Sequence, residues 1–315
     1  MSIVRIYADE AYCNKRTFRI ITLIWGSPGY VEQLESAIAA VVQNNRTVLG
    51  PNFKEFHAHK LTRKNWATLS PVYEAVLAEL FERMHFRQVG LQTVILSEDR
   101  FKGNAGWLTD AVRKKLEDRT SDLGQQFQSF GEGDLPAVYY RVNQLFPIFR
   151  YREFLAAPGD HLEYFPDSTG KVLNYVNTNF PMSGTLPFSL PLNYLEIIRM
   201  FGDAYLKSFG VMVKELGLGK WPTSIQHLVK FQPTDSASSY LIQLCDIVSN
   251  FIFSFIRYCC GLPDAKYQLK SAVLKKYIQM EEVEPAIKAS FSIEGTDVIC
   301  TAPDLWVNIN PLALE

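Results

Sequence analysis

One apolar segment constrains the fold of this chain more than any other part of its sequence. Residues 238–258 read SSYLIQLCDIVSNFIFSFIRY, and polar side chains recur in it at Ser239, Gln243, Asp246, Asn250 and Arg257. At 3.6 residues per turn these five positions form one narrow stripe, while the other faces are apolar. The pattern predicts a helix that is buried on most of its surface. A buried carboxylate is costly unless it is paired or binds a cation, so Asp246 needs a partner.

The composition indicates a soluble globular protein. The chain has 315 residues, 47% of them hydrophobic, which is enough to bury a large core in one or two domains. A formal net charge of -1 gives no overall positive field, so a nucleic-acid site would be a local patch. The five cysteines lack zinc-site spacing, which favours reduced thiols in a cytoplasmic protein. We expect no membrane association, because neither a signal peptide nor an uninterrupted apolar run of about 18 residues is visible.

Strand and helix patterns alternate along the chain. Strands are expected at residues 3–8, 17–25, 88–97, 161–165 and 224–231, and helices at 30–43, 62–85, 138–156, 170–179, 195–216, 238–258 and near 269–280. Pro71 predicts a kink or a break in the second helix. Residues 99–135, rich in charge and then in Gly, Gln and Ser, are expected to be an insertion. The order predicts an α/β fold with a mixed sheet, made of a main domain (residues 1–262) and a C-terminal extension (residues 263–315) packed on it.

Four acidic residues stand where metal chemistry would place them, at Asp9, Glu55, Asp167 and Asp246. Asp9 is expected to end the first strand, Glu55 to precede a helix, and Asp167 to follow an internal strand. Open α/β sheets bind ligands beyond the ends of their strands, and Mg²⁺ or Mn²⁺ prefers carboxylate oxygens. The four acids therefore predict a metal centre suited to phosphodiester hydrolysis.

Each of these acids also has a purely structural explanation. Asp9 suits a hairpin turn, and Glu55 suits a helix start, where the helix dipole favours negative charge. Asp167 lies in Pro-Asp-Ser-Thr-Gly, an ordinary turn or N-cap sequence. Asp246 would pair with Arg257 or another base.

Neighbouring polar residues are candidates for supporting roles. The expected accessory residues are Glu10, His57, Gln243 and Asn250, and the expected phosphate contacts are Lys54, Lys60, Arg63 and Lys64. Adjacent strand residues point to opposite faces, so only one of Asp9 and Glu10 can serve a given site. His57 would be an outer-shell or proton-transfer group, or else an ordinary histidine at a helix entry. For the basic residues the structural alternative is a solvated helix face.

Two motifs at the ends of the pattern resemble a known family. Asp9-Glu10 after the first strand is similar to an Asp-Glu-Ser opening, and Gln243-Leu244-Cys245-Asp246 is similar to a closing Gln-Leu-Ala-Asp helix. This opening and this closing helix are typical of the prokaryotic domain-of-unknown-function family numbered three thousand eight hundred, which the chain resembles. Glu55-Phe56-His57-Ala58 and the segment 161–167 resemble the stretches between them. Ala11-Tyr12 stands in place of Ser-Gly, and Cys245 in place of Ala, but neither departure removes a carboxylate.

The resemblance implies a fold and a function. The family looks like a member of the ribonuclease H-like superfamily, which implies a ribonuclease H-like mixed sheet flanked by helices over roughly residues 3–258. The four acids then match the metal-binding quartet of such nucleases. The expected function is a Mg²⁺- or Mn²⁺-dependent nuclease that acts on RNA or DNA. The alternative is a catalytically inactive ribonuclease H-like binding or effector-scaffold module. A role in phage defence, and a homodimer or protein partner, are expectations by analogy.

Overall fold

The computed structural model describes residues 2–12, 18–97, 160–167, 228–232, 234–262, 264–295, 297–301 and 304–308. Contacts divide the chain into two compact units, and each acid named above belongs to the unit made of Ile3–Glu98, Tyr164–Asp167 and Gln232–Glu315. The other unit comprises Met1–Ser2, Asp99–Glu163 and Ser168–Phe231. The predicted insertion (99–135) and the helices predicted at 138–156, 170–179 and 195–216 lie outside the described residues.

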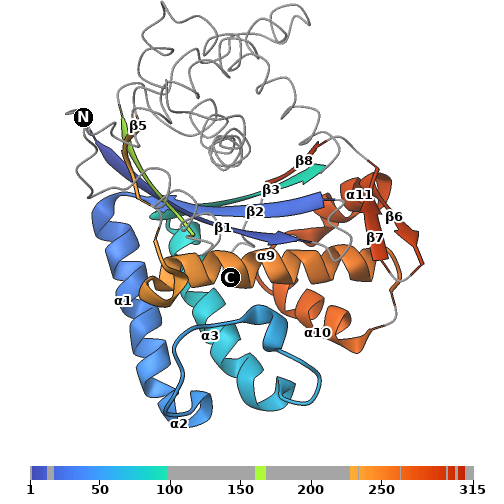
Figure 1. Ribbon diagram of the computed structural model, residues 1–315, viewed down its shortest axis with the longest axis horizontal. Coiled ribbons are helices and arrows are strands. Elements are labelled where there is room, and N and C mark those ends of the chain that lie inside the picture. Colours follow the sequence, from blue (N-terminus) through green and yellow to red (C-terminus); the bar gives the residue numbers. More distant parts are fainter. Residues whose placement is uncertain are drawn as a thin grey trace, which may run out of the picture. The chain divides into compact units, whose positions relative to one another are not determined.

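A mixed β-sheet forms the framework of the fold, as the sequence predicts (Figure 1). Its strand order is β5-β4-β1-β2-β3-β8, with β1 (Ile3–Tyr12), β2 (Phe18–Gly26), β3 (Val89–Ser97), β4 (His161–Pro166), β5 (Leu228–Phe231) and β8 (Asp304–Asn308). Strands β1, β2, β3 and β8 pair antiparallel in succession. Beyond the last residues of β4 the chain makes a parallel bridge from Asp167 to Thr234.

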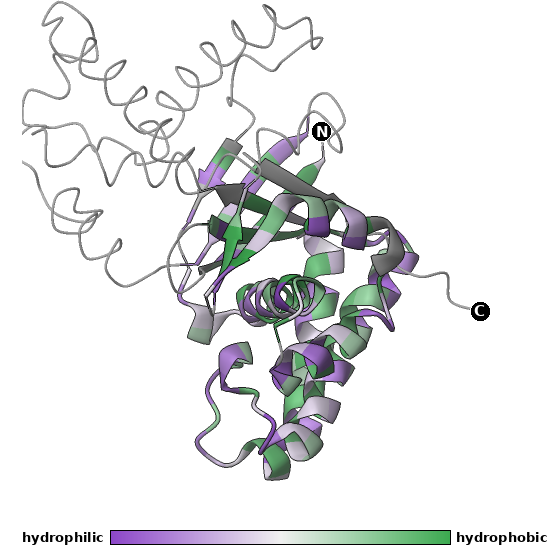
Figure 2. Ribbon diagram, turned by 90° about the vertical axis from the view of Figure 1, so that its right-hand side faces the viewer, coloured by the Kyte–Doolittle hydropathy of each residue, from purple (hydrophilic) through white to green (hydrophobic). Residues whose placement is uncertain are grey.

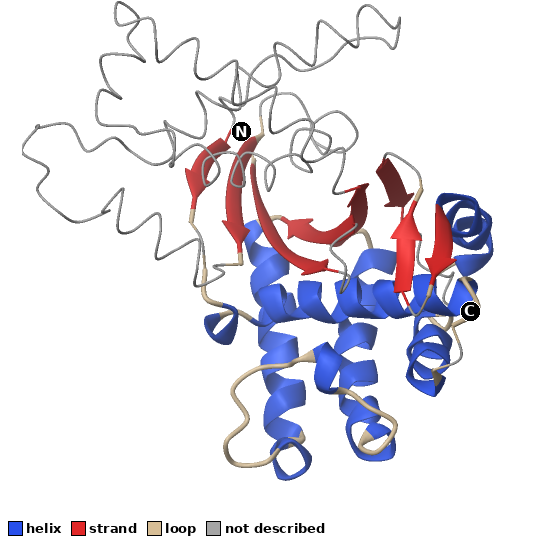
Figure 3. Cartoon of the chain, turned by 45° about the vertical axis from the view of Figure 1, so that its right-hand side comes forward, coloured by secondary structure: helices blue, strands red, loops and turns tan. Residues whose placement is uncertain are grey.

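Helices cover one face of this sheet (Figures 1 and 3). The long ones are α1 (Pro28–Asn44), α3 (Trp66–His85), α9 (Tyr240–Cys259) and α10 (Ala265–Leu274), and the short ones are α2 (Arg46–Leu49), η1 (Ala58–Lys60) and η3 (Ser236–Ser238). Helix α3 continues through Pro71 as one element. The chain then forms α11 (Met280–Ser290) and a hairpin of β6 (Phe291–Glu294) and β7 (Asp297–Cys300).

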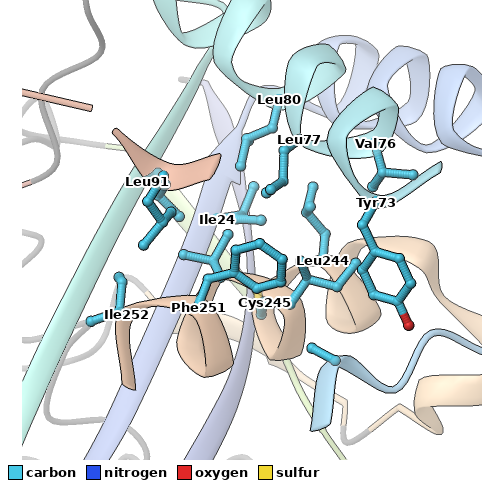
Figure 4. Packing of buried hydrophobic residues seen from close by; sticks show 14 of the residues in the cluster. Ile24, Tyr73, Val76, Leu77, Leu80, Leu91, Leu244, Cys245, Phe251 and Ile252 are labelled. Atoms are coloured by element: carbon cyan, nitrogen blue, oxygen red, sulfur yellow. The ribbon is translucent and has the colours of Figure 1, made fainter. Parts of the chain in front are cut away.

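Helix α9 lies at the centre of the core, as its apolar sequence predicts. It packs across β1 and β2, and α1, α3 and α10 contact it from other sides. Figure 4 shows Leu244, Cys245 and Phe251 of α9 meeting Ile24 of β2 and Leu77 of α3, and all five side chains are fully buried. Burying one such large apolar side chain contributes about 1.5–3 kcal/mol, so this helix stabilises the whole unit. Figure 2 shows the same concentration of apolar residues in the strands and in the helices packed on them.

Hydropathy alone does not distinguish α9 from a membrane span. Within the described part of the chain it is the one helix long and apolar enough to cross a bilayer, yet 78% of its most apolar window is buried inside the protein. That burial is typical of a core helix in a soluble protein.

The predicted helix near residues 269–280 was wrong in its boundaries. Helix α10 ends at Leu274, a turn follows, and α11 begins at Met280. Helix α10 begins before the predicted start near residue 269, because Asp264 caps it: the Asp264 carboxylate accepts a hydrogen bond from the backbone N–H of Lys266 at 2.9 Å. The C-terminal segment thus supplies a helix that packs on α9 and a strand, β8, that pairs with β3.

Candidate functional site

Asp9 lies inside strand β1 and not at its end. The strand continues to Tyr12, and Asp9 pairs with Thr22 of β2. The predicted strand end was therefore wrong, because the weak alternation after Ala8 hides four more paired residues. The side chain of Asp9 points to the helix-covered face, the face that also carries Thr22, whose hydroxyl accepts a hydrogen bond from Ser249 of α9 at 2.7 Å.

Asp167 stands beside Asp9, just past the end of the neighbouring strand β4. Its backbone N–H donates to the carbonyl oxygen of Ala8 at 2.8 Å. In a parallel pair this bond aligns residue 167 with residue 9, so both side chains leave the sheet on the same face. The structure therefore brings two of the predicted acids together from positions 158 residues apart in the sequence.

Asp246 approaches the same face from helix α9. Its Oδ2 accepts a hydrogen bond from the backbone N–H of Ala58 at 3.3 Å. Burial raises the pKa of Asp246, while the Ala58 N–H and the positive charges of His59, His57 and Lys270 act in the opposite direction. Within the described residues no basic side chain lies within 4 Å of this carboxylate.

The three aspartates act on one another electrostatically. Burial raises the pKa of Asp9 well above its ordinary value, and the negative charges of Asp167 and Asp246 raise it further. The backbone N–H of Glu10, which donates to Oδ1 of Asp9 at 2.7 Å, offsets only part of this. The same field raises the pKa of Cys245, a buried thiol whose ionisation is opposed first by burial and then by Asp9. The three aspartates therefore form a cluster of negative charge on this face of the sheet.

Glu55 occupies a different environment from the three aspartates. It lies in a segment without regular secondary structure before η1, and the predicted helix start falls three residues later, at Ala58. Its Oε1 is 2.7 Å from Nε2 of His57, and its Oε2 accepts a hydrogen bond from Ser236 Oγ at 2.9 Å. Both carboxylate oxygens are thus engaged, and Glu55 orients His57.

Two residues of the polar stripe on α9, Gln243 and Asn250, position the segment that carries Glu55 and His57. Gln243 accepts from the backbone N–H of Phe56 at 3.0 Å and donates to the carbonyl oxygen of Ser236 at 2.7 Å. Asn250 accepts at 2.8 Å from Nζ of Lys270, which also donates to the carbonyl oxygen of Ala58 at 2.8 Å. The two predicted accessory amides therefore position this segment, and Lys270 is a site residue that sequence reasoning missed.

Two other residues linked to the site by sequence lie elsewhere. Glu10 points to the opposite face of the sheet from Asp9, where its carboxylate is 3.7 Å from the guanidinium of Arg19. Arg257, which the sequence offered as a structural partner for Asp246, instead lies 3.6 Å from Asp297 of β7. It is eleven residues along α9 from Asp246, which corresponds to about 16 Å of helix.

The basic residues predicted to contact phosphates are all exposed around the Glu55 segment. They are Lys54, Lys60, Arg63 and Lys64, and they lie before, in and just after η1. His59 is also exposed, with its ring 5.4 Å from that of His57. These residues place positive charge on the segment whose Ala58 N–H binds Asp246.

The donor set has the chemistry of a hard-cation site. Carboxylate oxygens are the ligands that Mg²⁺ and Mn²⁺ prefer, and a cation would relieve the repulsion that raises the pKa of Asp9. Among the described residues no group of three or more His, Cys, Asp or Glu side chains stands at metal-binding spacing. Binding of an ion would therefore draw the aspartate side chains together.

Comparison with known proteins adds no relative. No protein-family model, no curated protein and no solved structure matches this chain.

Proposed function

We propose that this chain is a metal-dependent phosphodiester hydrolase, and specifically a nuclease. One observation carries the proposal: Asp9, Asp167 and Asp246, from three separate elements, lie close enough together that the charges of Asp167 and Asp246 add to the effect of burial in raising the pKa of Asp9. Packing like charges around a buried carboxylate is costly to folding unless a cation offsets them. A divalent ion would do so and would be retained for function.

The fold supports the ribonuclease H-like assignment within this proposal. Asp9 stands on β1, with the antiparallel strands β2 and β3 on one side and the strand that leads to Asp167 on the other. The helix that bears Asp246 packs across β1 and β2. Acids from the central strand, its neighbour and the covering helix thus lie on one face, which is the arrangement expected for three of the four predicted acids.

The residues of the site divide the work of the reaction. The three aspartates would hold the ion, which when bound supplies Lewis-acid charge for the attacking water and the phosphate. Glu55 holds Nε2 of His57, which leaves Nδ1 as the nitrogen that can accept or donate a proton. Lys54, Lys60, Arg63 and Lys64 would bind neighbouring phosphates of RNA or DNA.

Thermal unfolding with and without Mn²⁺ tests the metal half of the proposal. Wild type should be stabilised by Mn²⁺ increasingly as the ion concentration rises, because a ligand that binds only the folded state adds RT ln(1 + [L]/Kd). Asp9→Asn should abolish that stabilisation. Glu10→Gln is the matched control, because it changes the adjacent acid on the opposite face and should keep the Mn²⁺ response.

Cleavage assays test the substrate half. Short single-stranded RNA, single-stranded DNA and an RNA–DNA hybrid would be incubated with Mg²⁺ and with Mn²⁺. Wild type should cut at least one of them and Asp9→Ala none. Equal behaviour of the two proteins on every substrate would reject the nuclease and favour the catalytically inactive binding module.

A further inference from the structure

Tyr73 of α3 places a hydroxyl beside the segment that carries His57. The residue is 4% exposed, and its ring lies edge-on to that of Phe56, with the ring centres 5.1 Å apart. Figure 4 shows the hydroxyl pointing away from Val76 and Leu77 of the same helix. Burial raises the pKa of Tyr73 to about 12, while the backbone N–H of His57, which bonds to the hydroxyl oxygen, acts in the opposite direction. The hydroxyl therefore stays neutral at physiological pH, which suits a hydrogen-bonding group and not a base.

Side chains from α3 and α9 hold the backbone that leads into η1. Three consecutive backbone N–H groups there donate to side chains, Phe56 to Gln243, His57 to Tyr73 and Ala58 to Asp246. The segment thus has its backbone donors bound where it has no regular secondary structure to bind them. Because Asp246 is one of the proposed ion ligands, the arrangement also sets His57 one residue from a contact with the proposed metal centre.

His57 is held at three of its polar groups. Its N–H bonds to Tyr73, its carbonyl oxygen accepts from the backbone N–H of Lys60 at 2.9 Å, and its Nε2 lies 2.7 Å from Oε1 of Glu55. The two backbone contacts fix the direction in which the side chain leaves the chain, and the Glu55 contact then fixes the ring. A proton-transfer group gains most of its effect from such a fixed position.

We propose that the Tyr73 hydroxyl is a positioning group for His57, which takes a proton from the attacking water or gives one to the leaving oxygen of the phosphodiester. The inference rests on the proposed nuclease function and adds to that site a residue of α3, which no sequence pattern singled out. Tyr73 acts through the backbone of His57, so it is a positioning residue and contributes to turnover and not to substrate binding.

Tyr73→Phe tests this in the full-length chain, because it removes the hydroxyl and keeps the ring against Phe56. Its kcat should fall roughly threefold to tenfold, the effect of losing one neutral hydrogen bond. Its KM should stay within about twofold of wild type, and Mn²⁺ should still stabilise it. Tyr277→Phe is the matched control: its hydroxyl donates to the carbonyl oxygen of Glu74 in α3 at 3.4 Å, and kcat should not change.

A double-mutant cycle separates positioning from a merely structural role. His57→Ala should lower kcat about a hundredfold or more, and adding Tyr73→Phe should lower it no further, because the hydroxyl acts only through the imidazole. In a His59→Ala background Tyr73→Phe should keep its full effect, although the rings of the two histidines are only 5.4 Å apart. An equal fall in kcat with and without the imidazole at position 57 would overturn the inference.

Amide hydrogen exchange gives a second measurement that does not depend on cleavage. The His57 N–H should exchange slowly in wild type and faster in Tyr73→Phe, and fast exchange in wild type would overturn the inference. Full kcat in Tyr73→Phe beside an active wild type would overturn it too, and would leave the nuclease proposal intact. A wild type that cuts no substrate with Mg²⁺ or Mn²⁺ would reject the proposed function itself, and the inference with it.

Discussion

Helix α9 carries two charged side chains, Arg257 and Asp246, whose surroundings differ. Arg257, near its C-terminal end, donates to the hydroxyl of Tyr267, lies 3.6 Å from Asp297, and stacks 4.3 Å from the ring centre of Phe253. Asp246 receives one backbone N–H at 3.3 Å, and its charge adds to burial and to the charge of Asp167 in raising the pKa of Asp9. Arg257 therefore has an anion and an aromatic face against its guanidinium, whereas among the described residues Asp246 has no basic side chain within 4 Å.

Under the proposed function, this difference separates a structural charge from a ligand-binding charge on a single helix. A buried cation that serves folding is surrounded by acceptors, anions and aromatic faces, because the absence of such partners reduces stability. A buried charge that binds a ligand lacks some of its partners within the protein, and the ligand supplies the missing contacts. The polar stripe looks uniform in the sequence, yet under the proposed function its members serve both purposes. Replacing each charge in turn should therefore give effects of opposite sign.

Loss of Arg257 should have the largest effect on stability. Arg257→Met leaves Asp297 buried without its cation, and breaking a buried pair in this way costs about 3–5 kcal/mol. Urea unfolding would measure this as a fall in the midpoint at unchanged slope. Lys276→Met, which removes an exposed ion pair with Glu74, serves as the control and should change the midpoint little. A similarly small change for Arg257→Met would remove the contrast between the two ends of α9.

Asp246→Asn should have the opposite effect. It removes one of the mutually repelling charges, so the metal-free protein should unfold at the same temperature as wild type or higher, while Mn²⁺ should no longer stabilise it. Differential scanning fluorimetry with and without Mn²⁺ would measure both. A large loss of stability without metal would instead mean that Asp246 is a structural partner of Lys270.

The raised pKa of Asp9 predicts that the stability of the protein depends on pH. Its pKa is higher in the folded chain than in the unfolded chain, so the folded state binds the proton more tightly, and stability is lost as pH rises through the folded-state pKa. Asp9→Asn should be more stable than wild type at pH 8, and the difference should shrink as pH falls toward the ordinary carboxyl range. Free energies of unfolding measured from pH 4 to pH 8 would show this. A difference that does not vary with pH would contradict the raised pKa.

The exposed basic strip should affect stability least and substrate most. Replacing Lys60 and Lys64 with Ala should change the free energy of unfolding by less than about 0.5 kcal/mol, because both side chains are solvated. Cleavage should slow, and its dependence on salt should weaken by a slope of roughly 0.7–0.9 for each phosphate that is no longer bound. Unchanged salt dependence would show that these lysines form only a solvated surface.

The sequence predicted the parts of this site that depend on local periodicity. The apolar helix with its stripe, the first three strands and the short strand before Asp167 follow from patterns of 3.6 and 2 residues. Periodicity does not identify the residues that pack against a helix face, so the sequence offered Arg257 as a structural partner for Asp246. In the folded chain Arg257 lies too far along the helix to reach Asp246.

The remaining features depend on contacts between distant segments. Lys270 enters the site from a separate helix, and in the sequence it is one of many lysines on an amphipathic segment. The two oxygens of Glu55 contact His57 and Ser236, and Ser236 lies 181 positions from Glu55 in the sequence. Neither contact leaves a spacing pattern, so neither could be predicted without the fold.

A crystal grown in Mn²⁺ tests most directly whether the aspartates from β1, the end of β4 and α9 form a metal centre. Anomalous scattering should reveal an ion with carboxylate oxygens of Asp9 and Asp246 about 2.1–2.2 Å from it, which requires the two side chains to draw together. Asp167 should lie in the same coordination shell or bind through water. The prediction is contradicted if these carboxylates show no ion at saturating Mn²⁺, or if the ion binds elsewhere on the chain.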